Sequence, residues 1–431
     1  MDSQSKFRPL AAALEASESW ERETIKVHYM LKYIADKIQT QDDEACHCYQ
    51  FRLTDHGRTR YGIPNKDGLC STPRYKYQGE EVEAMFRIVD VKLFTFRTSV
   101  GILAYRVSFE NDDPFWISNA LFRMKKVSRK QLTLGSQDRK ITLLDLSSEL
   151  MGEFADITDC DFFFYAYEET ERANVLTFLM SDSKDDFSKE LFYLKRCYSE
   201  GYQYYKDEKR DNEENHVLSK GINWGVSPEA AVCIACPDAG IDGFINNTFF
   251  SNFNSQYLLM YVLLLHQKYV LYMYLTIIGN SDLSDLETLE NYKNRLYEFE
   301  TDFVFSCITE VPQYQVLYDK IARAFALRRM YEDVHEPITS LAEVRHEAAE
   351  KEQLERDESI NSALILLSGL TIFSALIDSF DFFESALAKF FGASSSAVAT
   401  VQAIVVILII GIAMYVLGKL ISARSKLKKK K

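Results

Sequence analysis

The sequence lacks the short motifs that identify most nucleotide-hydrolysing and dinucleotide-binding enzymes. Neither Gly-x-x-x-x-Gly-Lys-Ser/Thr nor Gly-x-Gly-x-x-Gly occurs, so the familiar phosphate-binding loops are absent. The histidines His28, His216, His335 and His346 show no metal-ligand spacing, and no nucleophile–base pair stands out. We therefore expect that the protein is not an enzyme.

The N-terminus, MDSQSKFRPL, lacks the apolar segment of a secretory signal. The eight cysteines lack the spacing of a disulfide framework, which predicts reduced, mostly buried cytosolic thiols. Cys233-Ile-Ala-Cys236 and Cys46-His47-Cys48 together leave a structural zinc site as an alternative, although neither has a second spaced pair of its own. A net charge of −13 argues against direct nucleic-acid binding.

The first part of the 431-residue chain interleaves strand-like and helix-like segments. This order predicts an α/β (α+β) cytoplasmic domain over residues 1–280, which we expect to sense a ligand. The expected strands are two joined near Thr98 and Ser99, then Ile141 to Leu144, Cys160 to Tyr167 and Val175 to Met180. The expected helices are residues 10–40 and Asp186 to Tyr198, and the polar run Tyr204 to His216 is expected to be a solvated loop.

The apolar segment Tyr257 to Ile278 is long enough to cross a bilayer, but His266, Gln267 and Lys268 lie at its centre. Because a central lysine is costly in lipid, the sequence favours a buried helix of the domain. Residues 281–360 are predicted to form a helical stalk with breaks at Pro312 and Pro337. A capping box, Ser340 to Glu343, is expected to open the stalk helix that leads into the next apolar segment.

Residues 361–420 are predicted to form a transmembrane hairpin, with spans at about 361–380 and 397–420. Residues 397–418 carry no charge and are long enough to cross the hydrocarbon core. The lysine-rich tail, residues 421–431, is expected to remain cytoplasmic by the positive-inside rule, and two crossings place the domain on the same side. We therefore expect a multi-pass protein of the inner (plasma) membrane of a prokaryote.

Polar residues recur along the first predicted span at helical spacing. Asn361, Ser368, Thr371 and Asp378 share one face, which indicates a water-filled path or, alternatively, helix–helix packing. One hairpin cannot enclose a pore, so the pore hypothesis requires a homo-oligomeric ring. Asp381 and Glu384 would then join Asp378 in attracting cations at the pore mouth.

An acidic α/β domain, a long stalk helix, two spans and a basic tail resemble the CorA family of divalent-cation channels, most closely over Asp282 to Lys431. The resemblance implies a pentamer whose first span lines the pore, with Mg²⁺ as the transported ion. The Gly-Met-Asn signature of family transporters is replaced here by Asp378-Ser-Phe-Asp-Phe-Phe-Glu384, which puts magnesium selectivity in doubt. Divergent CorA-like proteins without that signature occur beside type III CRISPR systems as membrane effectors opened by a nucleotide messenger, S-adenosyl methionine joined to AMP.

Arginines and aromatic residues around the predicted strand pair are the candidates for binding such a small nucleotide ligand. They are Arg87, Arg97, Arg106 and Arg123 for phosphate, and Trp116 for base stacking. The leading hypothesis is a messenger-gated, CorA-like cation channel that acts in antiviral defence. The alternatives are a constitutive magnesium or divalent-cation transporter, a membrane-tethered nucleotide-degrading enzyme, and a tethered scaffold without a pore.

Overall fold

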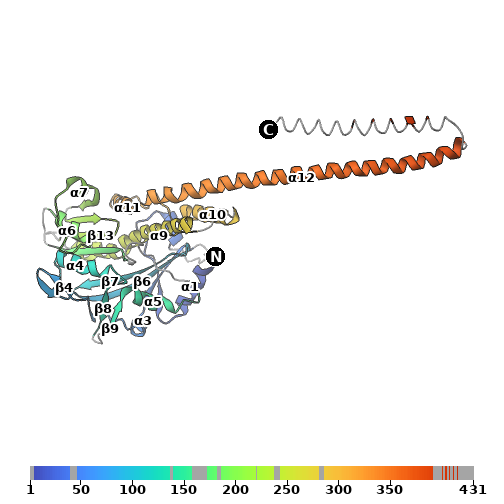
Figure 1. The fold of residues 1–431 in the computed structure, drawn as a ribbon. Helices are drawn as coiled ribbons and strands as arrows, with labels where there is room; N and C mark the ends of the chain where they lie inside the picture. The colour runs from blue at the N-terminus through green and yellow to red at the C-terminus, as the bar shows by residue number, and fades with distance from the viewer. Residues whose placement is uncertain are drawn as a thin grey trace. The chain divides into compact units, whose positions relative to one another are not determined.

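The computed structural model describes residues 4–38, 46–135, 139–157, 172–181, 186–219, 221–236, 243–280, 286–391 and six single positions between 400 and 415. The chain divides into two units, Met1–Ala342 and Glu343–Lys431. The described part of the first unit contains two large sheets, a two-stranded sheet and a layer of helices, and the described backbone of the second unit is mainly one helix (Figure 1). The coarse prediction of a mixed α/β region followed by a long helix is confirmed.

The larger sheet is antiparallel and is built around one long central strand. Its strand order is β1-β2-β6-β3-β8-β9, and β7 pairs with β6. The predicted strand pair is confirmed, because β6 and β7 are joined by a turn at 97–100 in which Ser99 has a φ of 67°. The strands are β1 Trp20–Glu23, β2 Cys48–Leu53, β3 Leu69–Ser71, β6 Met85–Phe96, β7 Gly101–Phe109, β8 Gln131–Leu134 and β9 Arg139–Thr142.

Helices α1 (Gln4–Ala16) and α5 (Leu143–Gly152) cover the apolar face of this sheet. Phe7 and Leu14 of α1 share a core with Phe86 of β6. The predicted single helix over residues 10–40 is wrong, because α1 ends at Ala16 and the chain then forms β1 before α2 (Lys32–Ile38). Pairing of β1 with β2, which buries Trp20, overrides the helical pattern here.

The smaller sheet has the order β10-β13-β12-β11, in which β10 and β13 are parallel. Both faces of β13 are buried: Val232 and Ile234 face α4 and α6, whereas Ala231 and Cys233 face α9. This double burial explains the continuous apolar run of β13. The elements are β10 Val175–Met180, β11 Asn215–Ser219, β12 Ile222–Val226, β13 Ala230–Ala235, α4 Pro114–Met124 and α6 Ser188–Leu194.

Three local predictions near this sheet have different outcomes. Val175 to Met180 forms β10, as predicted, and Ile141 to Leu144 is divided between β9 and α5. The solvated loop predicted over Tyr204 to His216 is wrong, since it contains α7 (Glu208–Glu214) and the start of β11. Cys160 to Tyr167 lies outside the described residues. The remaining short elements of the N-terminal part are the helix α3 (Asp55–Arg60) and the strands β4 (Tyr75–Tyr77) and β5 (Glu80–Val82).

The helical layer supports the core-helix interpretation of the ambiguous apolar segment. Helix α9 (Leu258–Asn280) follows η2 Phe244–Phe249, α8 Phe250–Asn252 and η3 Phe253–Tyr257. Within the described part of the chain, 244–279 is the one helical stretch long and apolar enough to cross a membrane, and 72% of its most apolar window is buried in the protein. Burial against both sheets and the neighbouring helices makes α9 a core helix of the first unit.

The three helices after α9 show how the two prolines act. Helix α10 (Leu286–Phe303) ends well before Pro312, which is the first residue of α11 (Pro312–Ala324), so the predicted break is confirmed. The break predicted at Pro337 is wrong, because α12 (Leu327–Phe391) runs through it and no helix begins at Ser340. Val334 and Ile338, which are buried beside the proline, hold this part of α12 in the core.

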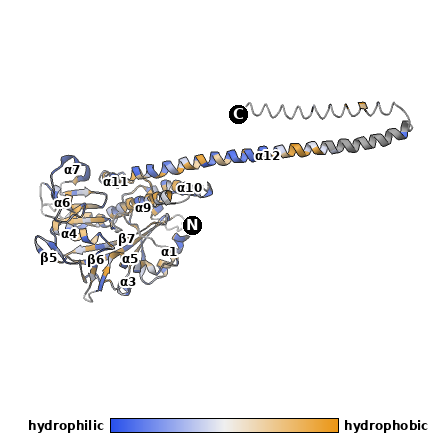
Figure 2. Ribbon diagram, in the orientation of Figure 1, coloured by the Kyte–Doolittle hydropathy of each residue, from blue (hydrophilic) through white to orange (hydrophobic). Residues whose placement is uncertain are grey.

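In the second unit, α12 changes from a charged surface to an apolar one along its length (Figure 2). Leu364, Ile365, Leu366, Leu367 and Leu370 are all exposed. Most residues of the second predicted span, and all of the basic tail, lie outside the described residues. The two-span hairpin therefore stays a prediction, and its first part coincides with helical backbone.

Candidate functional site: a cleft beside α9 and α10

The structure places four of the five predicted ligand-binding residues in separate local contacts. Arg87 Nη2 lies 2.6 Å from Glu110 Oε1, and the Arg106 guanidinium lies 5.5 Å from the Phe250 ring centroid. Arg123 lies 4.0 Å from the Tyr75 ring centroid, and burial lowers the pKa of its guanidinium. Trp116 is buried with its ring edge-on to Phe109, so it is a core residue. These four residues do not converge on one site.

Arg97, the fifth, lines a cleft of about 700 Å³ that we call the α9–α10 cleft. Its walls come from the β6–β7 turn, the end of α9 and one face of α10. The described lining residues are Arg97, Thr98, Ser99, Met273, Tyr274, Ile277, Thr288, Asn291, Tyr292, Asn294, Arg295, Glu298, Phe299, Asp302 and Phe303. The cleft therefore lies where the larger sheet meets the helical layer.

The α9–α10 cleft combines charges of both signs with aromatic surfaces. Arg97 and Arg295 supply cationic groups, and Glu298 and Asp302 supply carboxylates. Tyr274, Tyr292, Phe299 and Phe303 supply rings on which a base could stack. Such a lining suits a ligand that carries an anionic group, a cationic group and a flat ring system.

Two contacts fix the floor of this cleft. Thr98 Oγ1 lies 2.7 Å from Nε2 of His266, whose ring stacks on Phe96 with centroids 3.9 Å apart. Full burial lowers the pKa of His266 to about 3, so the imidazole is neutral at physiological pH. His266 is therefore a core histidine that holds the β6–β7 turn against α9.

Asp302 ties the rim of the cleft to α2 and to the segment before β2. Lys37 Nζ lies 2.8 Å from Asp302 Oδ1 and also donates to the Thr301 carbonyl at 2.9 Å. His47 Nδ1 lies 3.4 Å from Asp302 Oδ2, and burial lowers the pKa of this histidine despite the opposing effect of the carboxylate. A ligand that competes for Asp302 would loosen these links.

The two remaining polar residues at the centre of α9 are also accommodated inside the protein. Gln267 Nε2 donates to the Phe303 carbonyl at 2.7 Å and to the Tyr318 hydroxyl at 3.1 Å. Lys268 Nζ donates to the Pro228 carbonyl at 3.0 Å, and burial lowers the pKa of its ammonium to about 8. These partners explain why polar groups are tolerated in the centre of an apolar helix.

Helix α10 connects the cleft to the first turns of α12. The Tyr297 ring lies 6.1 Å from the ring of His335, which stacks on Tyr331 at 5.3 Å. Burial and a hydrogen bond to Glu300 of α10 raise the pKa of Tyr331. Phe299, which lines the cleft, belongs to the same core as Val334 of α12. A shift of α10 would therefore be felt directly by α12 within the first unit.

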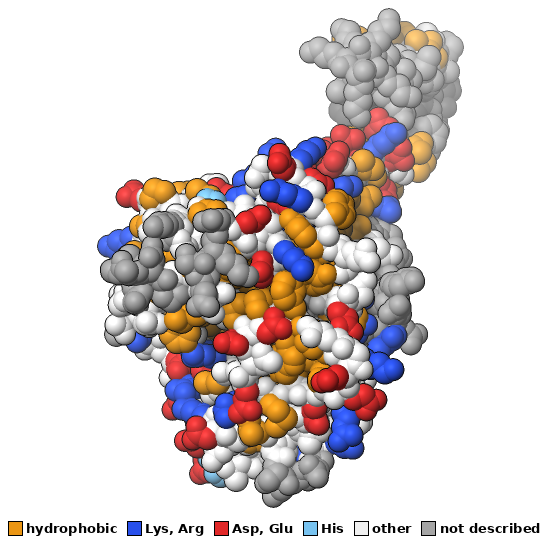
Figure 3. Space-filling model, turned by 90° about the vertical axis from the view of Figure 1, so that its left-hand side faces the viewer, with side chains coloured by type: hydrophobic (Ala, Val, Ile, Leu, Met, Phe, Trp, Pro, Cys, Tyr) orange, Lys and Arg blue, Asp and Glu red, His pale blue; other side chains and the backbone are white. Residues whose placement is uncertain are grey.

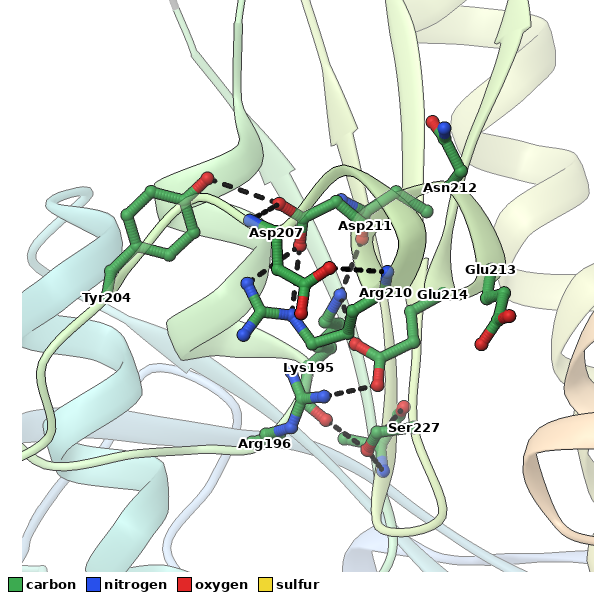
Figure 4. A network of polar contacts seen from close by, with 12 residues as sticks. Lys195, Arg196, Tyr204, Asp207, Arg210, Asp211, Asn212, Glu213, Glu214 and Ser227 are labelled. Carbon is green, nitrogen blue, oxygen red and sulfur yellow. Dashed lines mark hydrogen bonds and ion pairs between the residues drawn. The ribbon is translucent and has the colours of Figure 1, made fainter.

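A polar network around the buried Lys195 links the end of α6 to α7 and the smaller sheet (Figure 4), and Lys320 of α11 contacts its edge. Lys195 Nζ lies 2.7 Å from Glu214 Oε2 and donates to Asn215 Oδ1 at 2.7 Å. Burial lowers the pKa of Lys195 to about 8. Lys320 of α11 donates to the carbonyls of Asn212, Glu213 and Asn215 at 3.0 to 3.2 Å. Because these groups satisfy one another, we assign the network a structural role.

The zinc alternative is not supported by the described cysteines. Cys233 and Cys236 are both buried thiols, and they belong to cores on opposite faces of the smaller sheet. Burial raises the pKa of Cys233, which opposes thiolate formation. Among the residues that the structure describes, no group of three or more His, Cys, Asp or Glu side chains is arranged to hold a metal ion.

The predicted pore-lining residues lie on helical backbone. Asn361, Ser368 and Thr371 are exposed along α12, and their spacing places them on one face. Asp378, Asp381 and Glu384 also fall within α12, but their side chains are outside the described part of the structure. The helical spacing needed for a polar stripe is thus present as far as Thr371.

The sequence did carry a signal for the α10 side of the cleft. Thr288, Asn291, Arg295, Glu298 and Asp302 follow one another at spacings of three and four, which is a polar stripe on one helical face. We interpreted this region only as a stalk, so Arg295, Glu298 and Asp302 were missed. The contribution of the β6–β7 turn could not be found in this way, because it depends on tertiary packing.

No family model, no curated protein and no solved structure matches this chain.

Proposed function

We propose that this chain is a homo-oligomeric, CorA-like cation channel whose first unit binds a small intracellular nucleotide ligand. The observation that carries the proposal is α12, one helix of 65 residues. At its start Val334 and Ile338 are buried in the first unit, and further along Leu366 and Leu367 are exposed. A continuous helix of this kind can transmit a displacement from a binding domain to a membrane pore.

The exposed apolar part of α12 supports membrane insertion. Five large apolar side chains between 364 and 370 are exposed, and a soluble monomer rarely leaves such a surface in water. Lipid or the second predicted span would cover it. The protein would then be a multi-pass protein of a prokaryotic inner membrane, with its first unit and basic tail in the cytoplasm.

The polar stripe supports a pore in a ring of identical subunits. Asn361, Ser368 and Thr371 would line the pore, and Asp378, Asp381 and Glu384 would form an acidic mouth that attracts cations. By resemblance to the CorA family the ring would be a pentamer and Mg²⁺ a permeant ion. The lack of the Gly-Met-Asn signature leaves the ion selectivity to experiment.

The α9–α10 cleft is the site at which we place the ligand. The arginines would contact phosphate, and the two carboxylates would accept the amine or sulfonium of a messenger such as S-adenosyl methionine joined to AMP. Tyr274 or Tyr292 would stack on adenine. The ligand must bind the open and closed arrangements with different affinity, because equal affinity shifts no equilibrium. Movement of α10 would pass to α12 through Tyr297 and His335.

Ion flux from liposomes containing the purified full chain tests this proposal. We expect release only when the nucleotide messenger is added, and we expect Arg295→Ala to raise the half-activating concentration by about tenfold or more, as loss of one charge-assisted contact implies. Arg106→Ala, outside the cleft, is the matched control. Asp378→Asn with Asp381→Asn should reduce cation flux without changing messenger binding.

Three other outcomes would replace the proposal. Steady divalent flux without messenger would indicate a constitutive transporter. Messenger consumption without flux would indicate a membrane-tethered nucleotide-degrading enzyme, and neither flux nor turnover would favour a tethered scaffold.

A further inference from the structure

A second and larger cleft, about 1650 Å³ in volume, lies on the outer face of the larger sheet. We call it the β3–β8 cleft, after two of the strands that line it. Its described lining comprises Thr59, Gly62, Ile63, Pro64, Asn65, Asp67, Gly68, Leu69, Cys70, Ser71, Thr72, Pro73, Arg74, Glu83, Met85, Arg129, Lys130, Gln131, Thr133, Leu134, Gly135, Arg139 and Lys140. None of these residues lines the α9–α10 cleft.

Strand register explains why polar groups converge here. Ser71 pairs with Thr133, and Thr133 pairs with Lys140, so the three side chains lie in a row on one face of the sheet. Their neighbours Cys70, Leu134 and Ile141 point the other way, into the core. The row is therefore a polar surface presented by rigid strands.

The described lining of this cleft is basic, although the chain as a whole is acidic. It contains five basic residues, Arg74, Arg129, Lys130, Arg139 and Lys140, against two acidic ones, Asp67 and Glu83. The chain carries a net charge of −13. Figure 3 shows one face of the molecule, on which acidic and basic side chains are interspersed. A cationic hollow on an acidic protein concentrates anions locally.

Two lysines at this site are available for a ligand. Arg139 is already engaged by Glu149 and by the Tyr61 carbonyl, and Arg74 lies 4.0 Å from Glu83. Lys130 and Lys140 are exposed, and within the described ranges neither ammonium has a carboxylate at ion-pair distance. The hydroxyl group of Thr133 lines the same cleft and can donate to a further anionic oxygen.

The composition of the β3–β8 cleft also limits the kind of anion. Its described lining contains no Phe, Tyr, Trp or His, so it offers no ring on which a base could stack. Gly62 and Gly135, with φ of 63° each, let the backbone turn at its edge. Several cationic groups and a hydroxyl donor without an aromatic platform suit a phosphate chain better than a nucleobase.

We propose that the β3–β8 cleft binds a soluble anion carrying two or more phosphate groups, with Lys130 and Lys140 as the main contacts. This site is separate from the messenger cleft and does not depend on the channel hypothesis. An anionic lipid headgroup shares the same chemistry, and the experiment below distinguishes the two sources.

The test uses the full chain in phosphatidylcholine nanodiscs, titrated with tripolyphosphate in magnesium-free buffer. Lysine acetylation read by peptide mass spectrometry should show protection of Lys130 and Lys140, while the exposed Lys26 and Lys76 remain reactive. In calorimetry, Lys130→Gln with Lys140→Gln should weaken binding by about tenfold or more, as loss of charge-assisted contacts implies. Lys26→Gln with Lys76→Gln removes the same charge elsewhere and is the matched control.

Several outcomes would overturn this proposal. Equal weakening by the control pair would mean non-specific attraction, and absence of protection at Lys130 and Lys140 would mean that the cleft does not bind polyphosphate. Protection by phosphatidylglycerol discs without tripolyphosphate would assign the site to a lipid headgroup instead. Arg295→Ala should leave tripolyphosphate binding unchanged, so failure of the messenger hypothesis and failure of this one are distinguishable.

Discussion

Helix α9 and the apolar part of α12, residues 361–377, have similar compositions and opposite surroundings. In α9, Leu263 and Leu264 are 1% and 0% exposed, whereas Leu366 and Leu367 of α12 are 70% and 64% exposed. The apolar side chains of α9 pack against both sheets and the neighbouring helices. Those of α12 have no such cover among the described residues. Apolar composition alone therefore does not distinguish a core helix from a membrane span.

The polar groups at the centre of α9 differ in their partners from the hydroxyls of α12. In α9, Gln267 and Lys268 bond to carbonyls of other elements, such as Phe303 and Pro228. In α12, Ser362 and Thr371 donate to carbonyls four residues earlier in the same helix, at 2.7 and 2.5 Å. A bond within the helix satisfies a hydroxyl without a tertiary partner, as a helix in lipid requires, and Thr276 of α9 also makes such a bond. The comparison yields four predictions.

The largest expected effect comes from shortening one leucine in each helix. Leu264→Ala should lower the free energy of unfolding of the first unit by about 3–5 kcal/mol, because it leaves a cavity in a close-packed core. Leu367→Ala should change it by less than about 0.5 kcal/mol. Tryptophan fluorescence during denaturation of the full chain in detergent measures both, because Trp20, Trp116 and Trp224 all lie in the first unit. Equal effects would show that α12 packs against the first unit.

The second prediction concerns pH and His266. Its pKa is about 3 in the folded protein, below the unfolded value near 6.5, so the unfolded state binds the proton more readily. This contribution to stability is present above pH 6.5 and is lost as pH falls toward 3. At pH 4.5 the loss should be about 2–3 kcal/mol, and His266→Leu should flatten the profile. Replacing the exposed His56 is the control, and an unchanged profile for His266→Leu would contradict the assignment.

The third prediction compares the polar groups themselves. Gln267→Leu should destabilise the first unit by about 1–3 kcal/mol, because it leaves the Phe303 carbonyl buried without its donor. Ser362→Ala, which removes a hydroxyl that donates to the Glu358 carbonyl of its own helix, should cost under about 0.5 kcal/mol. Urea denaturation of both variants measures the difference. A large effect of Ser362→Ala would mean that this hydroxyl has a partner in another subunit or span.

Several elements of the fold were predictable from the sequence, whereas most residues of the candidate site were not. The polar triplet His266 to Lys268 was enough to identify α9 as a core helix, and period-two alternation located β6 and β7. Pro337 was misleading because burial of Val334 and Ile338 outweighs the missing hydrogen bond. Only Arg97 of the predicted ligand residues lines the α9–α10 cleft, since local sequence does not reveal which side chains tertiary packing brings to α10.

The smallest expected effect belongs to the charged part of α12. Arg356 and Glu352 form an ion pair at 2.8 Å, but their side chains are 75% and 66% exposed. Water and salt screen such a pair, so Arg356→Ala should change stability by less than about 0.5 kcal/mol.

In the first unit, Asp90 accepts from Arg52 Nε at 2.9 Å and from the Val91 N–H at 3.1 Å, and is mostly buried. Asp90→Ala should therefore cost more, and salt titration of both variants should alter only the Arg356→Ala difference. If Arg356→Ala instead destabilised the assembly, the charged part of α12 would be packed against another subunit, as a ring of stalk helices requires.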